Sequence, residues 1–223
     1  MKKTVLLLIS VVLTMAGTTA QNMFFPTKEG MTLEYANLNN KGKADNYTRM
    51  TIQTVEGSGD NLTVNYVMTF LDKNRKPAST LEVPYSVTIV NGVVELDMKN
   101  FATPGTESMI TVEGGRLRIP STLSPGLKLD DVNFTLTVNM GFKIRTDVAL
   151  TEQECLAVED ITVPAGTFNC YKLTQTSTAT VMRKTVINKI ITWYTPQIGE
   201  VKVETYDAKN KLQTTKVLQA VEN

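Results

Sequence analysis

Apolar and polar residues alternate along residues 61–70, NLTVNYVMTF, and this pattern restricts the possible fold more than any other feature of the chain. Every second residue is apolar, namely Leu62, Val64, Tyr66, Met68 and Phe70. A period of two places these side chains on one face of a β-strand and the intervening side chains, which are Thr and Asn except for Val67, on the other. The segment is therefore predicted to form a strand with one buried and one solvated face.

Residues 132–140, VNFTLTVNM, repeat the pattern with Val132, Phe134, Leu136, Val138 and Met140. Strands with a solvated face are typical of antiparallel sheets, because strands of parallel sheets are covered on both faces. No long helical pattern interrupts the strands, and only Glu95–Thr103 is a candidate for a short helix. We therefore expect a mostly antiparallel β protein.

Three polar turns between these strand patterns resemble one another, at residues 37–46, 71–79 and 206–214. Each combines Asn or Asp with lysines, as hairpin turns do. The lysines also allow a phosphate-binding interpretation, which we consider weaker than solvated turns. No stretch is long enough to be an interdomain linker, so residues 21–223 are expected to form a single domain.

The first 20 residues have the organisation of a secretory signal peptide, with Lys2 and Lys3 before an apolar run and small residues up to Ala20. The run is shorter than the roughly 20 residues that cross a bilayer. Cleavage is expected after Ala20, with no cysteine there to carry a lipid and no transmembrane segment left in the mature chain. The protein is thus expected to be periplasmic or extracellular.

The composition excludes several kinds of chemistry, because the chain has no histidine. Catalysis by Ser-His-Asp or Cys-His and zinc sites with imidazole ligands are ruled out. Two acidic pairs, Asp130 with Asp131 and Glu159 with Asp160, are the best material for an acid/base mechanism. Adjacent strand residues point to opposite faces, so neither pair acts together. We expect no enzyme activity, no metal and no cofactor.

The charge balance of the mature chain is close to neutral. Removing Lys2 and Lys3 from the 23 basic residues leaves 21, against 22 acidic residues, a net charge of −1. No run of the sequence concentrates Lys and Arg. Nucleic acid and anionic membranes are therefore not expected as partners from the sequence.

The segment VPAGTFNCYKL, residues 163–173, is predicted to form a hairpin whose turn is Pro164–Thr167. In that register Cys170 faces about Ile161, and Cys155 lies six positions further, roughly 20 Å away. Disulfides need Cα separations of about 4.4 to 6.8 Å, so both cysteines are expected to be free. An even cysteine count in an oxidising compartment keeps a disulfide as the alternative.

Four segments together resemble the DUF3108-like (TapB-like) family of exported proteins common in Bacteroidota: FFPTKEGMTLEY, LRIPSTLSPGLKLDD, ITVPAGTFNCYKL and TWYTPQIGEVKVETYDAKNKL. The resemblance implies an all-β fold, a strongly curved sheet or open half-barrel like those of lipoprotein carriers. It implies no catalytic residues. The structural positions of the motif are Pro164, Gly166, Cys170 and Gly199, where the glycines are expected to close turns with a positive φ.

Two sets of residues are weak candidates for binding a lipid or another apolar ligand. Met50, Met68 and Met140 fall on apolar strand faces, where pliable Met side chains can line a pocket. Trp193 and Tyr194 point to opposite faces of one strand, so one should be buried and the other at least partly exposed. The alternative to a ligand carrier is a structural or protein-interaction module of the cell envelope.

Overall fold

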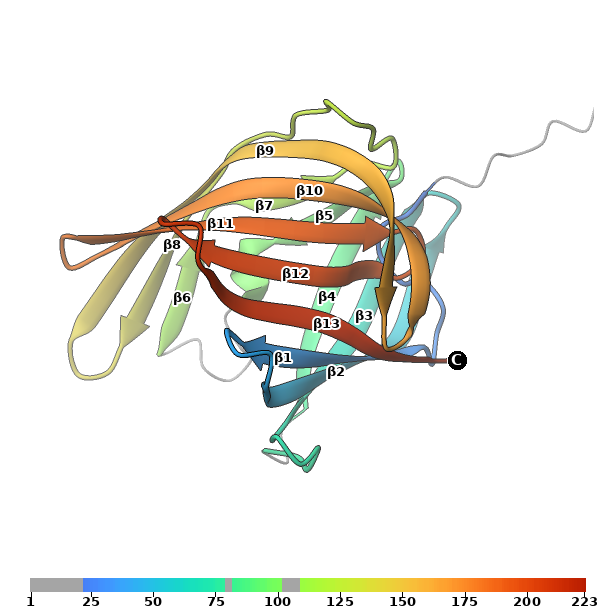
Figure 1. Cartoon of the computed structure of the whole chain (residues 1–223), viewed down its shortest axis with the longest axis horizontal. Coiled ribbons are helices and arrows are strands. Elements are labelled where there is room, and N and C mark those ends of the chain that lie inside the picture. Colours follow the sequence, from blue (N-terminus) through green and yellow to red (C-terminus); the bar gives the residue numbers. More distant parts are fainter. Residues whose placement is uncertain (1–21, 79–81, 102–108) are drawn as a thin grey trace, which may run out of the picture.

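The computed structural model describes residues 22–78, 82–101 and 109–223. Thirteen strands form one antiparallel sheet in the order β6-β8-β9-β10-β11-β12-β13-β1-β2-β3-β4-β5-β7 (Figure 1). The strands are β1 (Thr32–Asn39), β2 (Ala44–Ser58), β3 (Asn61–Leu71), β4 (Val83–Val90), β5 (Val93–Asp97), β6 (Ile110–Glu113), β7 (Arg116–Ile119), β8 (Val132–Asn139), β9 (Lys143–Val163), β10 (Gly166–Val181), β11 (Lys184–Thr195), β12 (Gly199–Asp207) and β13 (Leu212–Glu222).

The predicted fold class is confirmed, because the sheet is antiparallel, strongly curved and open between its edge strands β6 and β7. Within the described ranges, helical structure amounts to one 3₁₀ turn, η1 (Met98–Phe101). It falls inside the expected Glu95–Thr103 helix, whose first residues instead belong to β5. Residues 102 and 103 of that expectation, like the signal peptide, lie outside the described residues.

The two alternating segments form strands as predicted, namely β3 and β8. Val64 and Val132 are buried on them. The ends of both patterns differ from the expectation, since Phe70 and Met140 are 44% and 58% exposed. Met140 lies in the turn after β8, beyond the part of the strand that the sheet covers.

The sheet curls around a core built from the inward side chains of its strands. Strand β7 lies opposite β10 and β11 across this interior, so Ile119 and Leu117 approach Leu173 and Tyr194. The segment after β7 completes the wall, because backbone bonds join Gly126 and residues 127–129 to β9 (Gly126 N–H to the Cys155 carbonyl, 2.8 Å). Burial of these inward apolar side chains is the main driving force for folding.

The N-terminal segment, residues 22–31, closes one end of the curled sheet. Phe24 packs edge-on against Tyr171 of β10, with ring centroids 5.1 Å apart. Phe25 contacts Tyr66 of β3, with centroids 5.5 Å apart, and Tyr66 in turn stacks on Tyr85. Aromatic side chains from opposite walls of the sheet therefore fill this end.

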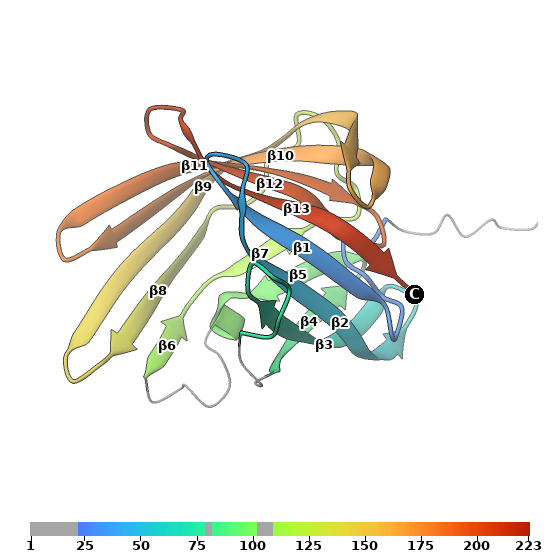
Figure 2. The ribbon, with the colours of Figure 1, turned by 60° about the horizontal axis from the view of Figure 1, so that its bottom comes forward.

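At the other end, β6, β8 and the adjoining halves of β9, β10 and β11 project beyond the main sheet (Figure 2). We call this part the wing, residues 109–113, 132–150 and 176–190. It has a small core of its own, formed by Met98, Val112, Val132 and Leu150. Strand β12 pairs with β11 only from Asn188 onward, so residues 184–187 form a free edge on that side.

The three turns that look alike in sequence share one conformation. Their first residues are Asn39, Asp72 and Asp207, and each side-chain oxygen accepts the backbone N–H groups of residues two and four positions later, at 2.8 to 3.2 Å. The backbone donors that would hold a phosphate are thus occupied by a side chain of the same turn. This geometry supports solvated hairpin turns rather than phosphate sites.

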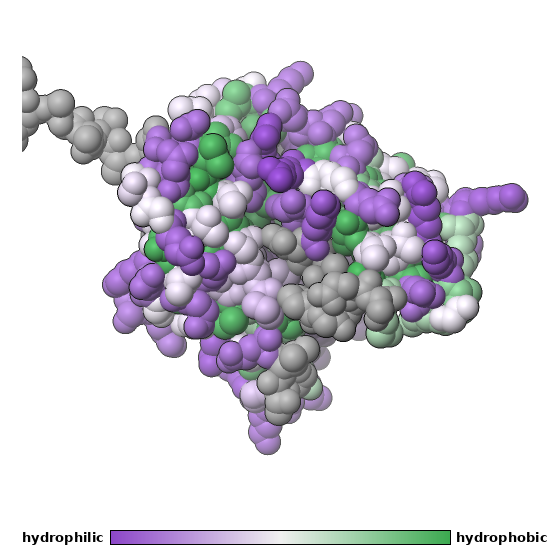
Figure 3. Space-filling model, turned by 180° about the vertical axis from the view of Figure 1, so that it is seen from behind, coloured by the Kyte–Doolittle hydropathy of each residue, from purple (hydrophilic) through white to green (hydrophobic). Residues whose placement is uncertain are grey.

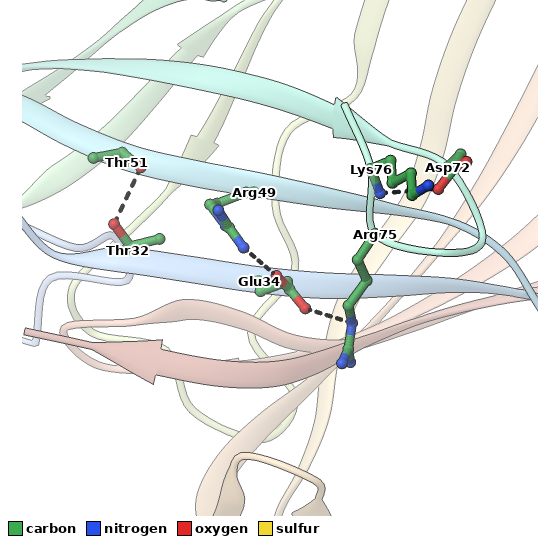
Figure 4. Close-up of polar contacts among 7 residues, drawn as sticks. All are labelled: Thr32, Glu34, Arg49, Thr51, Asp72, Arg75 and Lys76. Atoms are coloured by element: carbon green, nitrogen blue, oxygen red, sulfur yellow. Dashed lines mark hydrogen bonds and ion pairs between the residues drawn. The ribbon is translucent and has the colours of Figure 1, made fainter. Parts of the chain in front are cut away.

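One of these turns is tied to the neighbouring strands through Glu34, which is 9% exposed. Its carboxylate pairs with Arg49 of β2 at 2.8 Å and with Arg75 of the turn at 3.0 Å (Figure 4). The Arg75 guanidinium also lies 4.5 Å from the centroid of the Tyr47 ring. Two guanidinium partners compensate for the desolvation of the carboxylate.

The predicted β9–β10 hairpin is present, but its register differs from the expected one. Val163 pairs with Gly166, so the turn is Pro164–Ala165, and Cys170 pairs with Glu159 rather than Ile161. The expected Pro164–Thr167 turn is wrong by two residues, because Gly166 and Thr167 already pair with β9. Gly166 has a positive φ of 137° as predicted, although it is the first residue of β10.

Candidate functional site

Trp193 and Tyr194 lie on opposite faces of β11, as expected, but both are buried, at 5% and 7% exposed. The prediction that one of them is partly exposed is wrong. Tyr194 faces the interior of the curled sheet, next to β7. Trp193 faces outward, and no pattern in the sequence predicts that this face is covered.

The outer face near Trp193 is covered by the β9–β10 hairpin. Strands β9 and β10 bend sharply, and the hairpin tip crosses β12 and reaches β13 (Figure 1), neither of which is next to β9 in the sheet. The cross-strand row Trp193–Lys202–Val217–Ala36 lies on this face. Ala36 and Val217 are buried like Trp193, so the bent hairpin gives the outer face a small apolar layer.

Polar side chains hold the Trp193 ring in place. Its Nε1–H donates to Glu159 Oε1 at 2.7 Å, and the ammonium groups of Lys172 and Lys202 lie 5.2 and 4.9 Å from the ring centroid. The bond from Trp193 and the pairing with Lys172 at 3.2 Å lower the pKa of Glu159. The indole is therefore a satisfied anchor between two cations, and it does not offer a free aromatic platform to a ligand.

Tyr194 belongs to a polar group inside the sheet, with Tyr35, Glu200 and Lys216. The Tyr35 hydroxyl donates to the Glu200 carbonyl oxygen at 3.0 Å, and Lys216 Nζ lies 2.7 Å from Glu200 Oε2. Burial, and secondarily the nearby Glu200 carboxylate, raise the pKa values of both tyrosines well above the usual range. Both phenols stay protonated at neutral pH, which suits a structural network rather than a base or nucleophile.

The two cysteines are free and fully buried. Cys155 pairs with Leu173 and Cys170 with Glu159, so they lie three positions apart along the hairpin, about 10 Å. They also occupy opposite faces, since residues 170 and 173 of β10 differ by an odd number. Burial raises the pKa of Cys155, and burial with the neighbouring Asp160 and Glu159 carboxylates raises that of Cys170 to about 11.

Thiol counting under denaturing, non-reducing conditions is expected to find two reactive thiols in the wild type and one in Cys170→Ala. In the folded protein, neither should react with an aromatic disulfide reagent on the time scale of seconds, because both are buried and protonated. A count of zero after denaturation would mean that the two cysteines are bonded and that the register described here is wrong.

The three candidate methionines are not brought together. Met50 and Met68 pair across β2 and β3 on the inner face, with Met50 buried. Met140 lies in the exposed turn between β8 and β9. The structure thus provides no common pocket for the three side chains.

The interior leaves little room for a ligand. The hollow that the described strands enclose between β7, β10 and β11 has a volume of about 20 Å³, enough for one or two water molecules. A larger hollow of about 320 Å³ lies on the wing, lined mainly by Thr, Asn, Asp and Glu side chains and open to solvent. Pockets for apolar ligands have volumes of roughly 300 to 1,000 Å³ and are mostly apolar. The smaller hollow is enclosed and partly apolar, but it is far too small for such a ligand. The larger hollow is open and mainly polar.

The side chains of Glu159 and Asp160 on β9 have different partners, whereas Asp130 and Asp131 precede β8 and lie outside the strands. Glu159 contacts Trp193, whereas Asp160 accepts a hydrogen bond from Asn169 at 2.8 Å. The Asp130 carbonyl accepts a bond from Gln153. Among the described residues, no group of three or more acidic or cysteine side chains could hold a metal ion, and no helix is long and apolar enough to cross a membrane.

A feature that sequence reasoning missed is the concentration of exposed apolar side chains on the wing. Met109, Met140, Phe142, Met182, Val186 and Ile187 are each at least 45% exposed. Seen from behind, hydrophobic surface lies at the end formed by the wing, beside projecting hydrophilic side chains (Figure 3). The sequence signal for this surface was the presence of apolar residues in the β8–β9 and β10–β11 turns, because turn residues are usually polar.

One open, strongly curved antiparallel sheet, closed at one end by the N-terminal segment, places the chain in the class of all-β proteins. Two solved structures share this fold. A "putative exported protein with YmcC-like fold" from Bacteroides fragilis has 24% identity and a TM-score of 0.74, covering 91% of this chain and 100% of its own. A "putative lipoprotein" from Parabacteroides distasonis has 23% identity and a TM-score of 0.75, covering 90% of this chain and 99% of its own.

The chain belongs to the DUF3108-like family, whose model matches residues 28–218. The resemblance found in the sequence is therefore confirmed. A comparison with curated proteins finds no match. The names of the two similar structures agree with the expected export of this chain.

Proposed function

We propose that the protein is a docking module of the cell envelope, which acts through its outer surface and has no catalytic activity. The observation that carries this proposal is the filled interior. Phe24, Phe25 and Tyr194 are buried core residues, and Tyr66 packs against them. The hollow that the described strands enclose between β7, β10 and β11 has a volume of about 20 Å³, too small for a lipid.

The exposed surface of the wing supports the same proposal. Monomeric proteins rarely leave several large apolar side chains exposed close together unless the surface has a binding role. The free edge of β11 at residues 184–187 and the edge strand β6 adjoin this surface. The signal peptide predicted from the sequence and the names of the two similar structures favour a location outside the cytoplasm.

The alternative function, a carrier that holds a lipid inside the sheet, is tested directly by native mass spectrometry. Mature protein purified without detergent from its own envelope is expected to show the mass of the bare chain, and its organic extract should contain no lipid in stoichiometric amounts. An extract of the same fraction depleted of the protein serves as the control. A stoichiometric lipid that is released only on unfolding would contradict the docking proposal and favour the carrier.

A further inference from the structure

The far end of the wing carries exposed apolar side chains on two projecting turns. Met140 and Phe142 of the β8–β9 turn are 58% and 59% exposed, and Met182 of the β10–β11 turn is 65% exposed. Both views of the ribbon place the two turns at the same end of the molecule, side by side and away from the N-terminal segment (Figures 1 and 2). We call these two turns, residues 139–144 and 181–184, the wing tip.

The residues of the β10–β11 turn are not the ones that its backbone conformation favours. Val181 pairs with Lys184, so Met182 and Arg183 form a two-residue turn, with φ values of 46° and 66°. Two left-handed residues make a type I′ turn, for which Asn-Gly is strongly preferred. Methionine and arginine adopt this conformation at an energetic cost, so their side chains are candidates for a role outside the fold.

Basic residues adjoin the exposed apolar residues in both turns, and neither turn contains an acidic residue. The wing tip contains Lys143, Arg183 and Lys184, all exposed, and no Asp or Glu. This gives +3 on 10 residues, whereas the mature chain as a whole has a net charge of −1. The nearest carboxylate along β9, Asp147, already pairs with Arg145 at 3.0 Å.

We propose that the wing tip docks onto an anionic membrane surface, with Met140, Phe142 and Met182 inserted among the lipid headgroups and Lys143, Arg183 and Lys184 facing the lipid phosphates. This inference rests on the docking function proposed above and names its partner. Separate projecting turns, each with an apolar tip and cations one or two residues behind, match the layered polarity of a membrane interface. A protein partner would more commonly meet a flat patch with a desolvated centre.

Vesicle sedimentation with the mature chain, residues 21–223, tests the inference. Binding to phosphatidylcholine vesicles that contain phosphatidylglycerol is expected to be about tenfold or more stronger than to phosphatidylcholine alone. Molar salt should remove most of this difference, because it screens the cations. If the wild type binds neither vesicle at low salt, the membrane inference is wrong, while a bare mass in the extraction experiment would leave the docking function standing.

A double variant, M182N/R183G, separates a surface role from a folding role. It replaces the strained pair with the preferred turn residues, so the denaturation midpoint should rise, whereas binding to anionic vesicles should fall about tenfold. M140S/F142S should also weaken vesicle binding, and F70S, at an exposed phenylalanine of β3 outside the wing, should not. Unchanged binding by both wing-tip variants would overturn the inference. A concentration-dependent dimer that either variant abolishes would instead assign the wing tip to a second copy of the chain.

Discussion

Phe24→Ala is expected to destabilise the protein by about 3 to 5 kcal/mol, the cost of truncating a fully buried aromatic side chain. Phe24 is 1% exposed, packs on Tyr171, and belongs to the segment that closes one end of the sheet. The family model begins at residue 28, so Phe24 and the first part of this segment, residues 22–27, lie outside the matched part. The expected loss would show that the segment is an integral part of the folded domain. Urea unfolding followed by the fluorescence of Trp193, the one tryptophan of the chain, measures it.

Phe142→Ala is the matched control, because it makes the same truncation at a side chain that is 59% exposed. Its effect should stay within about 0.5 kcal/mol, as for surface substitutions. Equal midpoints for the wild type and Phe24→Ala would mean that residues 22–31 do not close the sheet in solution.

The sequence predicted the features that depend on local periodicity. Alternation in residues 61–70 and 132–140 defined strands β3 and β8, because a period of two is a property of the strand itself. The three Asx turns were also recognisable, since each is closed by a side chain within the turn. The resemblance to the family supplied the curvature of the sheet, which periodicity alone does not indicate.

The features that the sequence did not predict depend on contacts between distant segments. Trp193 is buried because the hairpin tip near residue 165 bends over the outer face of β11 to β13, and no local pattern around Trp193 signals that cover. The hairpin register was missed because Gly166, taken as a turn residue, begins β10. The cations of the wing tip come from turns about 40 residues apart, so the linear sequence shows no basic cluster even though the fold gathers one.

The cavity hypothesis illustrates the same limit. Methionines on alternating strand faces are compatible with a pocket and with an ordinary core. Phe24 and Phe25 favour the ordinary core, because they fill one end of the curled sheet from a segment that precedes the first strand. Their role became visible only through their contacts with Tyr171 and Tyr66.

Gly199→Ala is expected to cost about 2 to 4 kcal/mol, more than Gly166→Ala at about 1 to 2 kcal/mol, although both glycines have a positive φ. A Cβ on Gly166 would meet only the Phe168 ring at 3.8 Å, so the strain is confined to the backbone. A Cβ on Gly199 would lie 3.1 Å from the Phe24 carbonyl oxygen and 3.7 Å from Phe25 Cα. It would therefore push against the backbone of the N-terminal segment as well.

The comparison of the two variants tests whether the turn after β11 and the N-terminal segment stabilise each other. Gln197 N–H already donates to the Met23 carbonyl oxygen at 2.7 Å, which leaves the segment little freedom to move away. If Gly199 acts through Phe24, then Gly199→Ala added to Phe24→Ala should cost less than it does alone, because the segment can yield once its anchor is lost. Urea midpoints of the two single variants and the double variant measure this coupling. Strict additivity would show that Gly199 is required for its φ alone, and that the close approach of the N-terminal segment contributes nothing to its effect.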